Sequence, residues 1–442
     1  MVDLIPTFGN ALYTIGAFII ALSIIVAVHE YGHYIVGRWC GIKAEVFSIG
    51  FGPVLWAKSD RHGTQWQIAA LPFGGFVKFL GDAGAVSDRA SDDYDQLDPE
   101  TKRHTMHGAP LWARVLTVAA GPVFNFILSI IIFTGFVMSI GVATQPVTVS
   151  GMKPVPEVFT PLQPGDVILE LEGQAVSSPG DLTLNARELP QQATLTYLVE
   201  RDGARQQVEG PFPLLPMIGA ITPNSAADSV GLAEGDVILS IDGEPIQTFF
   251  QLQERAIASE GRTLLLEVWR GGELLEFSFN TKLGAVQTEN GMEERWLIGM
   301  TGDIGFELET RTPGLLEAAG YGVERTYGVI AGSLTGLYSM ISGAIGTCNL
   351  SGPVGIAKTS GSTASQGLDS FIWFIAVLST AVGLLNLFPI PVLDGGHLVF
   401  HAYEAVRGRP PSDRALRILM AAGLAVLLTL MIFALSNDLF CP

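Results

Sequence analysis

The sequence HEYGH, at residues 29–33, holds two imidazoles four positions apart with a carboxylate beside the first. Residues four apart lie on one face of an α-helix, so His29 and His33 can bind one metal ion. Glu30 could then accept a proton from a water molecule held by that ion. Five residues with three fixed recur by chance in many proteins, so the motif alone indicates a metal-dependent hydrolase only weakly.

The residues around this motif make it more informative, because they are almost all apolar. The stretch SIIVAVHEYGHYIVGRW, residues 23–39, reads as part of a membrane helix. Ionisable side chains are costly in such a helix, and binding a metal ion would offset that cost. The alternative is a set of polar side chains that face other helices, and the setting favours the metal site.

A third metal ligand must come from another part of the chain, because a catalytic zinc ion takes three protein ligands and keeps one position open. The segment NLFPIPVLDGGH, residues 386–397, offers Asp394 and His397. Asp394 is favoured, since it follows a proline-containing segment and precedes two glycines that can present it. A simple turn role for Asp394 is the alternative that spacing leaves open.

The composition indicates that the elements carrying these residues lie in a membrane. Charged residues make up 15% of the chain and the mean hydropathy is +0.39, whereas soluble proteins average about 25% charged residues. The net charge of −18 makes nucleic acid a poor partner. Four apolar runs are long enough to cross a bilayer: Ala11–Val28, Val115–Val142, Phe371–Phe388 and Ile418–Leu435. No basic residue precedes the first run, which argues against a cleaved signal peptide.

Lysine and arginine positions orient these four helices. Nine of these residues lie between positions 38 and 114 and four between 407 and 417, whereas the first ten residues and the tail after Leu435 have none. Basic loops stay in the cytoplasm, so both termini and the long central region should face the other side. This topology brings the HEYGH motif and Asp394 to a similar depth near the cytoplasmic face.

The central region contains an internal repeat. LQPGDVILELEG, residues 162–173, recurs 70 positions later as LAEGDVILSIDG, residues 232–243. Each copy reads as a Gly-Asp turn, a strand and a second turn, and resembles a PDZ domain. The likeness is stronger for the second copy, because the leader of the first, Val158–Pro161, is shorter. PDZ domains bind extended peptides by strand addition, and two β-rich domains without a ligand are the alternative.

A helical apolar pattern follows the second copy, at residues 312–345. It predicts an amphipathic helix on the outer membrane surface, or one packed against other parts of the protein.

Four stretches resemble the bacterial site-2 protease family, of the regulator-of-sigma-E protease type. They are VHEYGHYIVGRWCGIKAEVFSIGFGP (28–53), GPVFNF (121–126), NLSGPVGIA (349–357) and LLNLFPIPVLDGGH (384–397).

The resemblance implies roles for individual residues. His29, His33 and Asp394 would bind Zn²⁺ and Glu30 would be the general base. Asn386, Pro389 and Pro391 match the substrate-handling stretch of the family, and Asn125 matches a position near the active site without a firm role. Residues 51–82 are similar to a membrane-associated β-hairpin sheet whose edge would hold an extended substrate.

The predicted fold is a polytopic α-helical membrane protein with four transmembrane helices, a membrane-associated β-hairpin sheet and two β-rich PDZ-like domains inserted between helices two and three. The predicted segments are a first transmembrane helix (1–38), the hairpin region (39–110), a second transmembrane helix (111–143), the two PDZ-like domains (144–212 and 213–300), an outer amphipathic helix with its linker (301–365), a third transmembrane helix (366–397), a cytoplasmic loop (398–414) and a fourth transmembrane helix with the tail (415–442).

The resemblance also implies a function, an intramembrane zinc metalloprotease in the inner membrane of a Gram-negative cell. Its substrates would be single-span membrane proteins, such as an anti-sigma factor already trimmed by an outer-side protease, and signal-peptide remnants. The termini and the PDZ-like pair would be periplasmic, the active site would lie near the cytoplasmic side, and lipid would surround the helices.

Three other functions compete with this one. The first is an intramembrane metal transporter or sensor, which would not explain Glu30 or the repeat. The second is a PDZ scaffold with a degenerate site. The third is a membrane-anchored protease of the soluble zinc type with Glu45 as third ligand.

Overall fold

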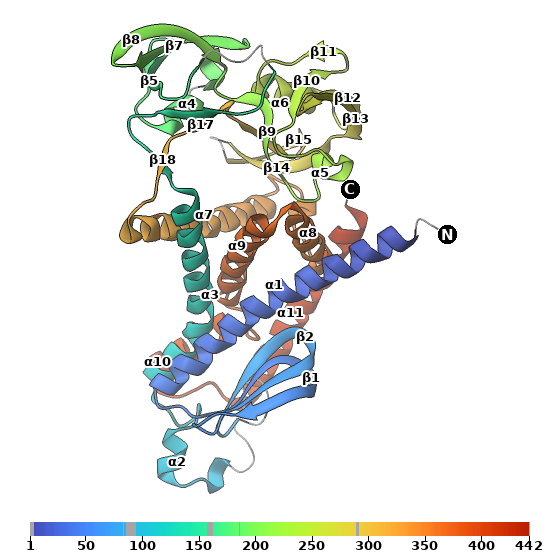
Figure 1. The fold of residues 1–442 in the computed structure, drawn as a ribbon. Coiled ribbons are helices and arrows are strands. Elements are labelled where there is room, and N and C mark those ends of the chain that lie inside the picture. The colour runs from blue at the N-terminus through green and yellow to red at the C-terminus, as the bar shows by residue number, and fades with distance from the viewer. Residues whose placement is uncertain are drawn as a thin grey trace. The chain divides into compact units, whose positions relative to one another are not determined.

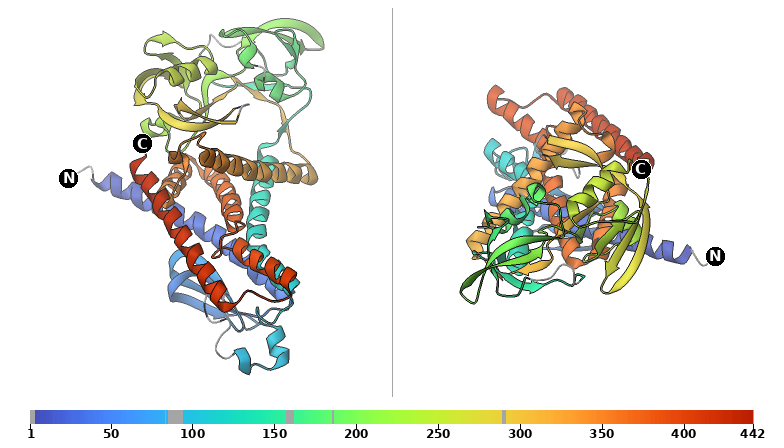
Figure 2. Two further views of the ribbon diagram at one scale, coloured as in Figure 1. Left: turned by 180° about the vertical axis from the view of Figure 1, so that it is seen from behind. Right: turned by 90° about the horizontal axis from the view of Figure 1, so that it is seen from above.

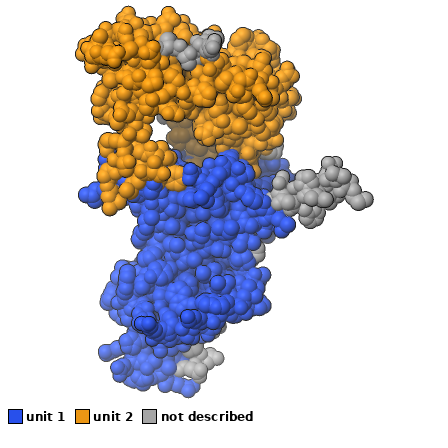
Figure 3. All heavy atoms as spheres, viewed as in Figure 1, with its two compact units in different colours: residues 1–135, 316–335, 350–441 blue, residues 136–315, 336–349, 442 orange. Residues whose placement is uncertain are grey.

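The computed structural model describes residues 4–82, 84, 94–156, 162–184, 186–288 and 291–441 (Figure 1). The chain forms two compact units (Figure 3). Unit 1 comprises residues 1–135, 316–335 and 350–441, and unit 2 comprises residues 136–315, 336–349 and 442.

Four helices are long and apolar enough to cross a membrane, counted over the residues that the structure describes. They are α1 (Leu4–Trp39), α3 (Leu111–Ile140), α9 (Leu368–Asn386) and α11 (Asp413–Phe440). Large apolar side chains such as Ile131 and Leu424 are exposed on them, as expected of helices that face lipid. This agrees with the four predicted spans.

Two shorter helices complete the helical part of unit 1. The helix α8 (Pro353–Gln366) packs on α1 and on α11 (Figure 2). Its N-terminus is capped by Asp438 of α11, whose carboxylate accepts hydrogen bonds from the backbone N–H groups of Gly352, Val354 and Gly355 (2.8, 2.9 and 3.0 Å). The second short helix, α10, spans Asp394–Arg407.

The segment predicted as a third span, residues 366–397, is divided in the structure. The helix α9 ends at Asn386 and α10 begins at Asp394. Pro389 and Pro391 lie in between, and proline cannot donate the backbone hydrogen bond that would continue a helix. The predicted loop at residues 398–414 is therefore helical as far as Arg407.

A long hairpin of β1 (Ala44–Ser59) and β2 (Gln65–Phe79) follows α1. Residues 46–49 of β1 pair on one side with residues 75–78 and on the other with residues 65–68, so the hairpin folds over itself. Tyr34 of α1 packs with Phe47 and Val77 in one core cluster. The 3-10 turn η1 (Tyr94–Gln96) and α2 (Pro99–Arg103) follow before α3. The predicted hairpin sheet is thus present, and its strands begin before residue 51.

The internal repeat of unit 2 is visible in its sheets. One sheet has the order β6-β5-β7-β8, and the other has the order β13-β12-β10-β9-β16 with β11 beside β10. The first copy consists of β5 (Val167–Leu171), β6 (Gln174–Ala175), α4 (Pro179–Leu184), η3 (Ala186–Glu188), β7 (Thr194–Arg201) and β8 (Ala204–Pro211). The second consists of β9 (Leu215–Ile221), α5 (Ala226–Val230), β10 (Val237–Ile241), β11 (Glu244–Pro245), α6 (Phe249–Ala258), β12 (Thr263–Arg270), β13 (Glu273–Asn280) and β16 (Met300–Asp303).

The two copies also share an ion pair at the Gly-Asp turn. The buried Asp166 accepts two hydrogen bonds from Arg201 (2.6 and 2.7 Å), and the buried Asp236 accepts two from Arg270 (2.6 and 2.6 Å). Each aspartate also accepts a backbone N–H from three residues earlier in the chain. This recurrence shows that the sequence repeat is a structural repeat; its likeness to PDZ domains stays a prediction.

The chain returns to the first copy after completing the second. The strand β17 (Phe306–Leu308) pairs with β4 (Val149–Met152), and β18 (Thr310–Arg311) pairs with β3 (Val142–Ala143). The strand β4 belongs to the first copy, because Thr148 forms a β-bridge with Val167 of β5 and Val149 lies in the same core cluster as Ile168. The second copy is therefore nested inside the first, whereas the predicted boundaries, 144–212 and 213–300, place the copies in series. The leader Val158–Pro161 lies outside the described residues.

The remaining elements are the hairpin of β14 (Lys282–Thr288) and β15 (Gly291–Leu297), the helix α7 (Leu315–Ser342) and the turn η4 (Thr347–Asn349). The helix α7 matches the predicted amphipathic segment, and its exposed apolar residues include Leu316, Val323, Tyr327, Leu334, Tyr338 and Ile341. Its place at a membrane surface stays a prediction.

Candidate metal centre

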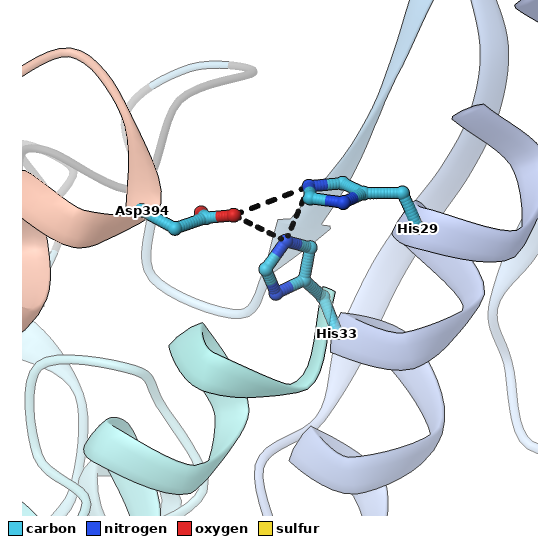
Figure 4. A group of neighbouring side chains, drawn as sticks. All are labelled: His29, His33 and Asp394. Carbon is cyan, nitrogen blue, oxygen red and sulfur yellow. Dashed lines mark hydrogen bonds and ion pairs between the residues drawn. The ribbon is translucent and has the colours of Figure 1, made fainter. Parts of the chain in front are cut away.

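Three side chains from α1 and α10 converge in unit 1 (Figure 4). The Nε2 atoms of His29 and His33 are 3.2 Å apart. Oδ2 of Asp394, at the start of α10, lies 3.2 Å from Nε2 of His29 and 3.5 Å from Nε2 of His33. These residues form the one group of three or more such ligands within mutual reach in the described part of the chain.

The helix α3 holds the far side of each imidazole. Nδ1 of His33 lies 2.8 Å from the backbone oxygen of Thr117. A carbonyl only accepts, so Nδ1 carries the proton and a neutral His33 turns its Nε2 lone pair to the group. The Asn125 side chain, fully buried, places Nδ2 3.2 Å from Nδ1 of His29.

Two glycines create the space in which the imidazoles meet. A Cβ on Gly121 of α3 would lie 2.6 Å from Cε1 of His33 and 2.8 Å from Cε1 of His29. A Cβ on Gly32 of α1 would lie 2.5 Å from the backbone oxygen of Ala120. Contacts this short are not tolerated, so the close approach of α1 to α3 at the site requires both glycines.

The position of Asp394 depends on the two glycines that follow it. A Cβ on Gly395 would collide with the carbonyl oxygens of Leu387 and Phe388, and one on Gly396 would collide with that of Ile390. The segment between α9 and α10 can therefore fold back onto the first turn of α10. This is the physical reason for the DGG sequence.

Glu30 lies beside the hairpin strand β2. A Cβ on Gly75 would lie 3.0 Å from Cγ of Glu30, and the backbone N–H of Val77 faces its carboxylate. Glu30 lines a cavity of about 490 Å³ together with His29, His33 and Asp394. The candidate base, the candidate ligands and a strand thus share one cavity.

The structure separates the other predicted residues. Asn386 lines the cavity, whereas Pro389 and Pro391 are not among its lining residues; Pro391 instead lies against Gly423 of α11. His397, one of the rival ligands, lines the cavity but does not belong to the group of three candidate ligands. Glu45 lies outside that group too and pairs with Lys78 (3.0 Å).

The residues present fit a zinc ion. Two imidazole nitrogens and a carboxylate oxygen are ordinary zinc ligands, and ligand atoms at the corners of a tetrahedral zinc site lie about 3.4 Å apart. The three distances of 3.2, 3.2 and 3.5 Å match that spacing. Oδ2 of Asp394 is buried and receives no hydrogen bond from the residues that the structure describes, which suits a metal ligand.

Sequence reasoning missed several of these contributions. Gly121 had a signal, because it stands one helical turn before Asn125 in GPVFNF. The carbonyl of Thr117 had none, since every residue carries one. An ion pair between Arg114 and Glu404, which lines the same cavity, was also not foreseen.

Comparisons with known proteins identify the family of the chain. The model of peptidase family M50 matches residues 17–430. A Rhizobium meliloti protein named as a zinc metalloprotease is 35% identical over 441 residues, which cover 97% of each chain. The regulator of sigma E protease of Haemophilus influenzae is 34% identical over 97% of this chain and 98% of its own. The regulator of sigma-E protease RseP of Salmonella typhimurium is 33% identical over 97% and 99% of the two chains. The resemblance found in the motifs is confirmed, and the chain belongs to peptidase family M50.

Proposed function

We propose that this zinc metalloprotease cleaves a peptide bond within the transmembrane segment of single-span membrane proteins. The family match and the names of the relatives support the enzyme class and its zinc ion. The observation that carries the proposal is the convergence of His29, His33 and Asp394 in a cavity that also holds Glu30.

In this proposal His29, His33 and Asp394 hold the zinc ion. When bound, zinc polarises the scissile carbonyl and makes a water molecule more acidic. The water oxygen attacks the carbonyl carbon while Glu30 takes the water proton, and Glu30 then gives the proton to the leaving nitrogen as the C–N bond breaks. The carbonyl of Thr117 fixes the orientation of His33.

Asn125 would orient the other imidazole. Its Oδ1 is buried without a hydrogen-bond partner among the described residues. With the amide turned over, Oδ1 accepts from the Nδ1–H of His29 and the Nε2 lone pair faces the zinc.

The β2 strand is the proposed site for the substrate backbone. Its arm at residues 75–78 lies at one edge of the folded hairpin and passes beside Glu30. A transmembrane helix must unwind before its carbonyls can be attacked, and strand addition would satisfy the freed backbone groups. Asn386, at the end of α9, would contact the substrate on the cavity side; Pro389 and Pro391 would act by shaping the turn before Asp394.

The names of two relatives support one class of physiological substrate. Two relatives carry the name regulator of sigma E protease. This name supports, as a substrate, an anti-sigma factor that is first trimmed on its outer side. Signal-peptide remnants are the second proposed class of substrate. The basic loops support an inner-membrane enzyme whose unit 2 faces the periplasm.

The proposal is tested with Glu30→Gln and Asp394→Asn, each assayed for zinc content and for cleavage of a single-span substrate in detergent. Glu30→Gln should keep its zinc and lose about 10²–10⁴-fold in rate, because the base is gone. Asp394→Asn should lose zinc, and a chelator should inactivate the wild-type enzyme.

His397→Ala is the matched control, because His397 is the rival ligand on the same helix, and it should keep its zinc. Cleavage retained by Glu30→Gln would refute the mechanism. Zinc lost from His397→Ala but kept by Asp394→Asn would reverse the ligand assignment. Zinc bound by the wild type without any cleavage would favour a transporter, sensor or scaffold.

A further inference from the structure

An ion pair joins α3 to α10 at the cavity wall. Nη1 and Nη2 of Arg114 donate to the two carboxylate oxygens of Glu404, at 2.9 and 2.6 Å. Nε of Arg114 donates to the backbone oxygen of Ala109 at 3.1 Å. The side chains are 16% and 17% exposed. A two-pronged pair of this kind fixes both the distance and the orientation of the groups it joins.

Arg114 belongs to a single stripe along α3. Arg114, Thr117, Gly121 and Asn125 follow one another at intervals of three, four and four residues, so they lie on one face of the helix. The last three face the two histidines of α1. One face of α3 therefore contacts both elements of the metal centre, α1 through the imidazoles and α10 through Arg114.

The helix α10 has few other anchors. Its fully buried residues are Gly395 and Gly396, in the first turn, and Leu398 packs partly buried against the core cluster that contains Tyr34 and Val118. Farther along, Val399, Tyr403 and Val406 are 50%, 41% and 87% exposed. Glu404 lies ten residues beyond Asp394, about 15 Å along the helix axis. The direction of α10 is thus set by its first turn, by Leu398 and, farthest from Asp394, by Glu404.

We propose that Arg114 and Glu404 are a positioning pair, which docks α10 on α3 and so keeps Asp394 in register with His29 and His33. The inference rests on the proposed ligand set. The pair lies outside the group of three candidate ligands, and in this inference it acts through the helix that carries Asp394. A lysine at position 114 would keep the positive charge but could not bind both carboxylate oxygens of Glu404 in the fixed geometry of the guanidinium group.

The test measures zinc affinity of the full-length protein in detergent, by competition with a chromophoric chelator. Arg114→Gln and Glu404→Gln should each bind zinc about 10–100-fold more weakly, as expected when support of a ligand is lost. Arg114→Lys should fall between these variants and the wild type. The exchanged pair, Arg114→Glu with Glu404→Arg, should recover most of the affinity. Helix content by circular dichroism should be unchanged throughout.

Arg407→Gln is the matched control, because it removes a charge from the last turn of the same helix, where Arg407 lies over the Tyr403 ring. It should bind zinc like the wild type. If the single variants lose helix content, the exchanged pair decides: a refolded protein with weak zinc binding contradicts the proposal.

Asp394→Asn separates this inference from the proposed function. Wild-type zinc affinity in Asp394→Asn would mean that the ligand set is wrong. Weak affinity in Asp394→Asn, with wild-type affinity in Arg114→Gln and Glu404→Gln, would overturn the positioning pair alone.

Discussion

Gly121 leaves room for the two imidazoles of the candidate metal centre because it has no side chain. A Cβ at this position would occupy the space taken by both imidazoles. Gly121→Ala should therefore weaken zinc binding by at least about tenfold, by displacing His29 and His33. Alanine normally stabilises a helix interior by about 1 kcal/mol relative to glycine, so the loss would not come from a weaker helix. Zinc content and substrate cleavage measure the effect.

Gly135→Ala is the control for that change. Gly135 lies on the same helix, and a Cβ there meets nothing within 4 Å. This variant should keep its zinc and its activity. Full zinc binding by Gly121→Ala would show that α1 and α3 can separate without harm to the site.

At the scale of elements, Asp60 ties the β1–β2 hairpin to α1. Its Oδ2 accepts hydrogen bonds from the Tyr34 hydroxyl and the Trp66 indole N–H (both 3.1 Å). Its Oδ1 accepts the backbone N–H groups of His62 and Thr64 (2.8 and 3.0 Å). Burial opposes ionisation, but these hydrogen bonds outweigh it and lower the pKa of Asp60 to about 2.

The lowered pKa predicts a pH dependence of the hairpin. An aspartate in an unfolded chain has a pKa of about 3.9, so the stabilisation by Asp60 is complete above that pH and is lost as the pH falls through about 2. The protection factors of the hairpin amides against hydrogen exchange, which are corrected for the intrinsic exchange rate at each pH, should fall across this window. Asp60→Asn should reduce their protection about tenfold at pH 7 and remove the contribution of this group to the pH dependence.

Asp98→Asn serves as the comparison, since Asp98 caps α2 outside the hairpin. It should leave the protection of the hairpin amides unchanged. Equal protection in wild type and Asp60→Asn at pH 7 would show that the hairpin is held to α1 by its apolar contacts alone.

At the scale of the whole molecule, the two ends of the repeat region lie next to each other. The strands β3 and β18 are paired, and the backbone N–H of Thr144 donates to the oxygen of Glu309 (2.8 Å). Residues 145–308 can therefore be replaced by a short glycine-serine linker without stretching the chain. A shorter deletion, of residues 155–282, would leave β4 and β17 in place without the core that they cover.

The excision tests whether the PDZ-like pair excludes untrimmed substrates. If it does, the shortened enzyme should cleave a full-length single-span protein nearly as fast as its trimmed form, whereas the intact enzyme should strongly prefer the trimmed one. Zinc content should be equal in both proteins. An unchanged preference for the trimmed substrate would show that the PDZ-like pair does not exclude untrimmed substrates.

The sequence was sufficient for the parts of the protein that depend on local pattern. Hydropathy predicted the four spans, and helical spacing brought His29 and His33 together. Asp394 was predicted as the third ligand because two prolines precede it and two glycines follow it. The pair of Arg114 and Glu404 was not found, because the two residues are far apart in the chain and nothing in their local sequence relates them. The return of β17 to β4 was missed for the same reason, since short strands carry little pattern of their own.

The separation of the proposed ligands along the chain has a consequence for biosynthesis. His29, Glu30 and His33 leave the ribosome roughly 360 residues before Asp394. At about 5–20 residues per second this is a delay of roughly 20–70 s, during which the first helix is already made. Throughout that time the nascent chain has only two of its three proposed zinc ligands. With the proposed ligand set, the nascent protease would be inactive while α1, α3 and α9 are being made, and it would become active only after nine-tenths of the chain has been translated.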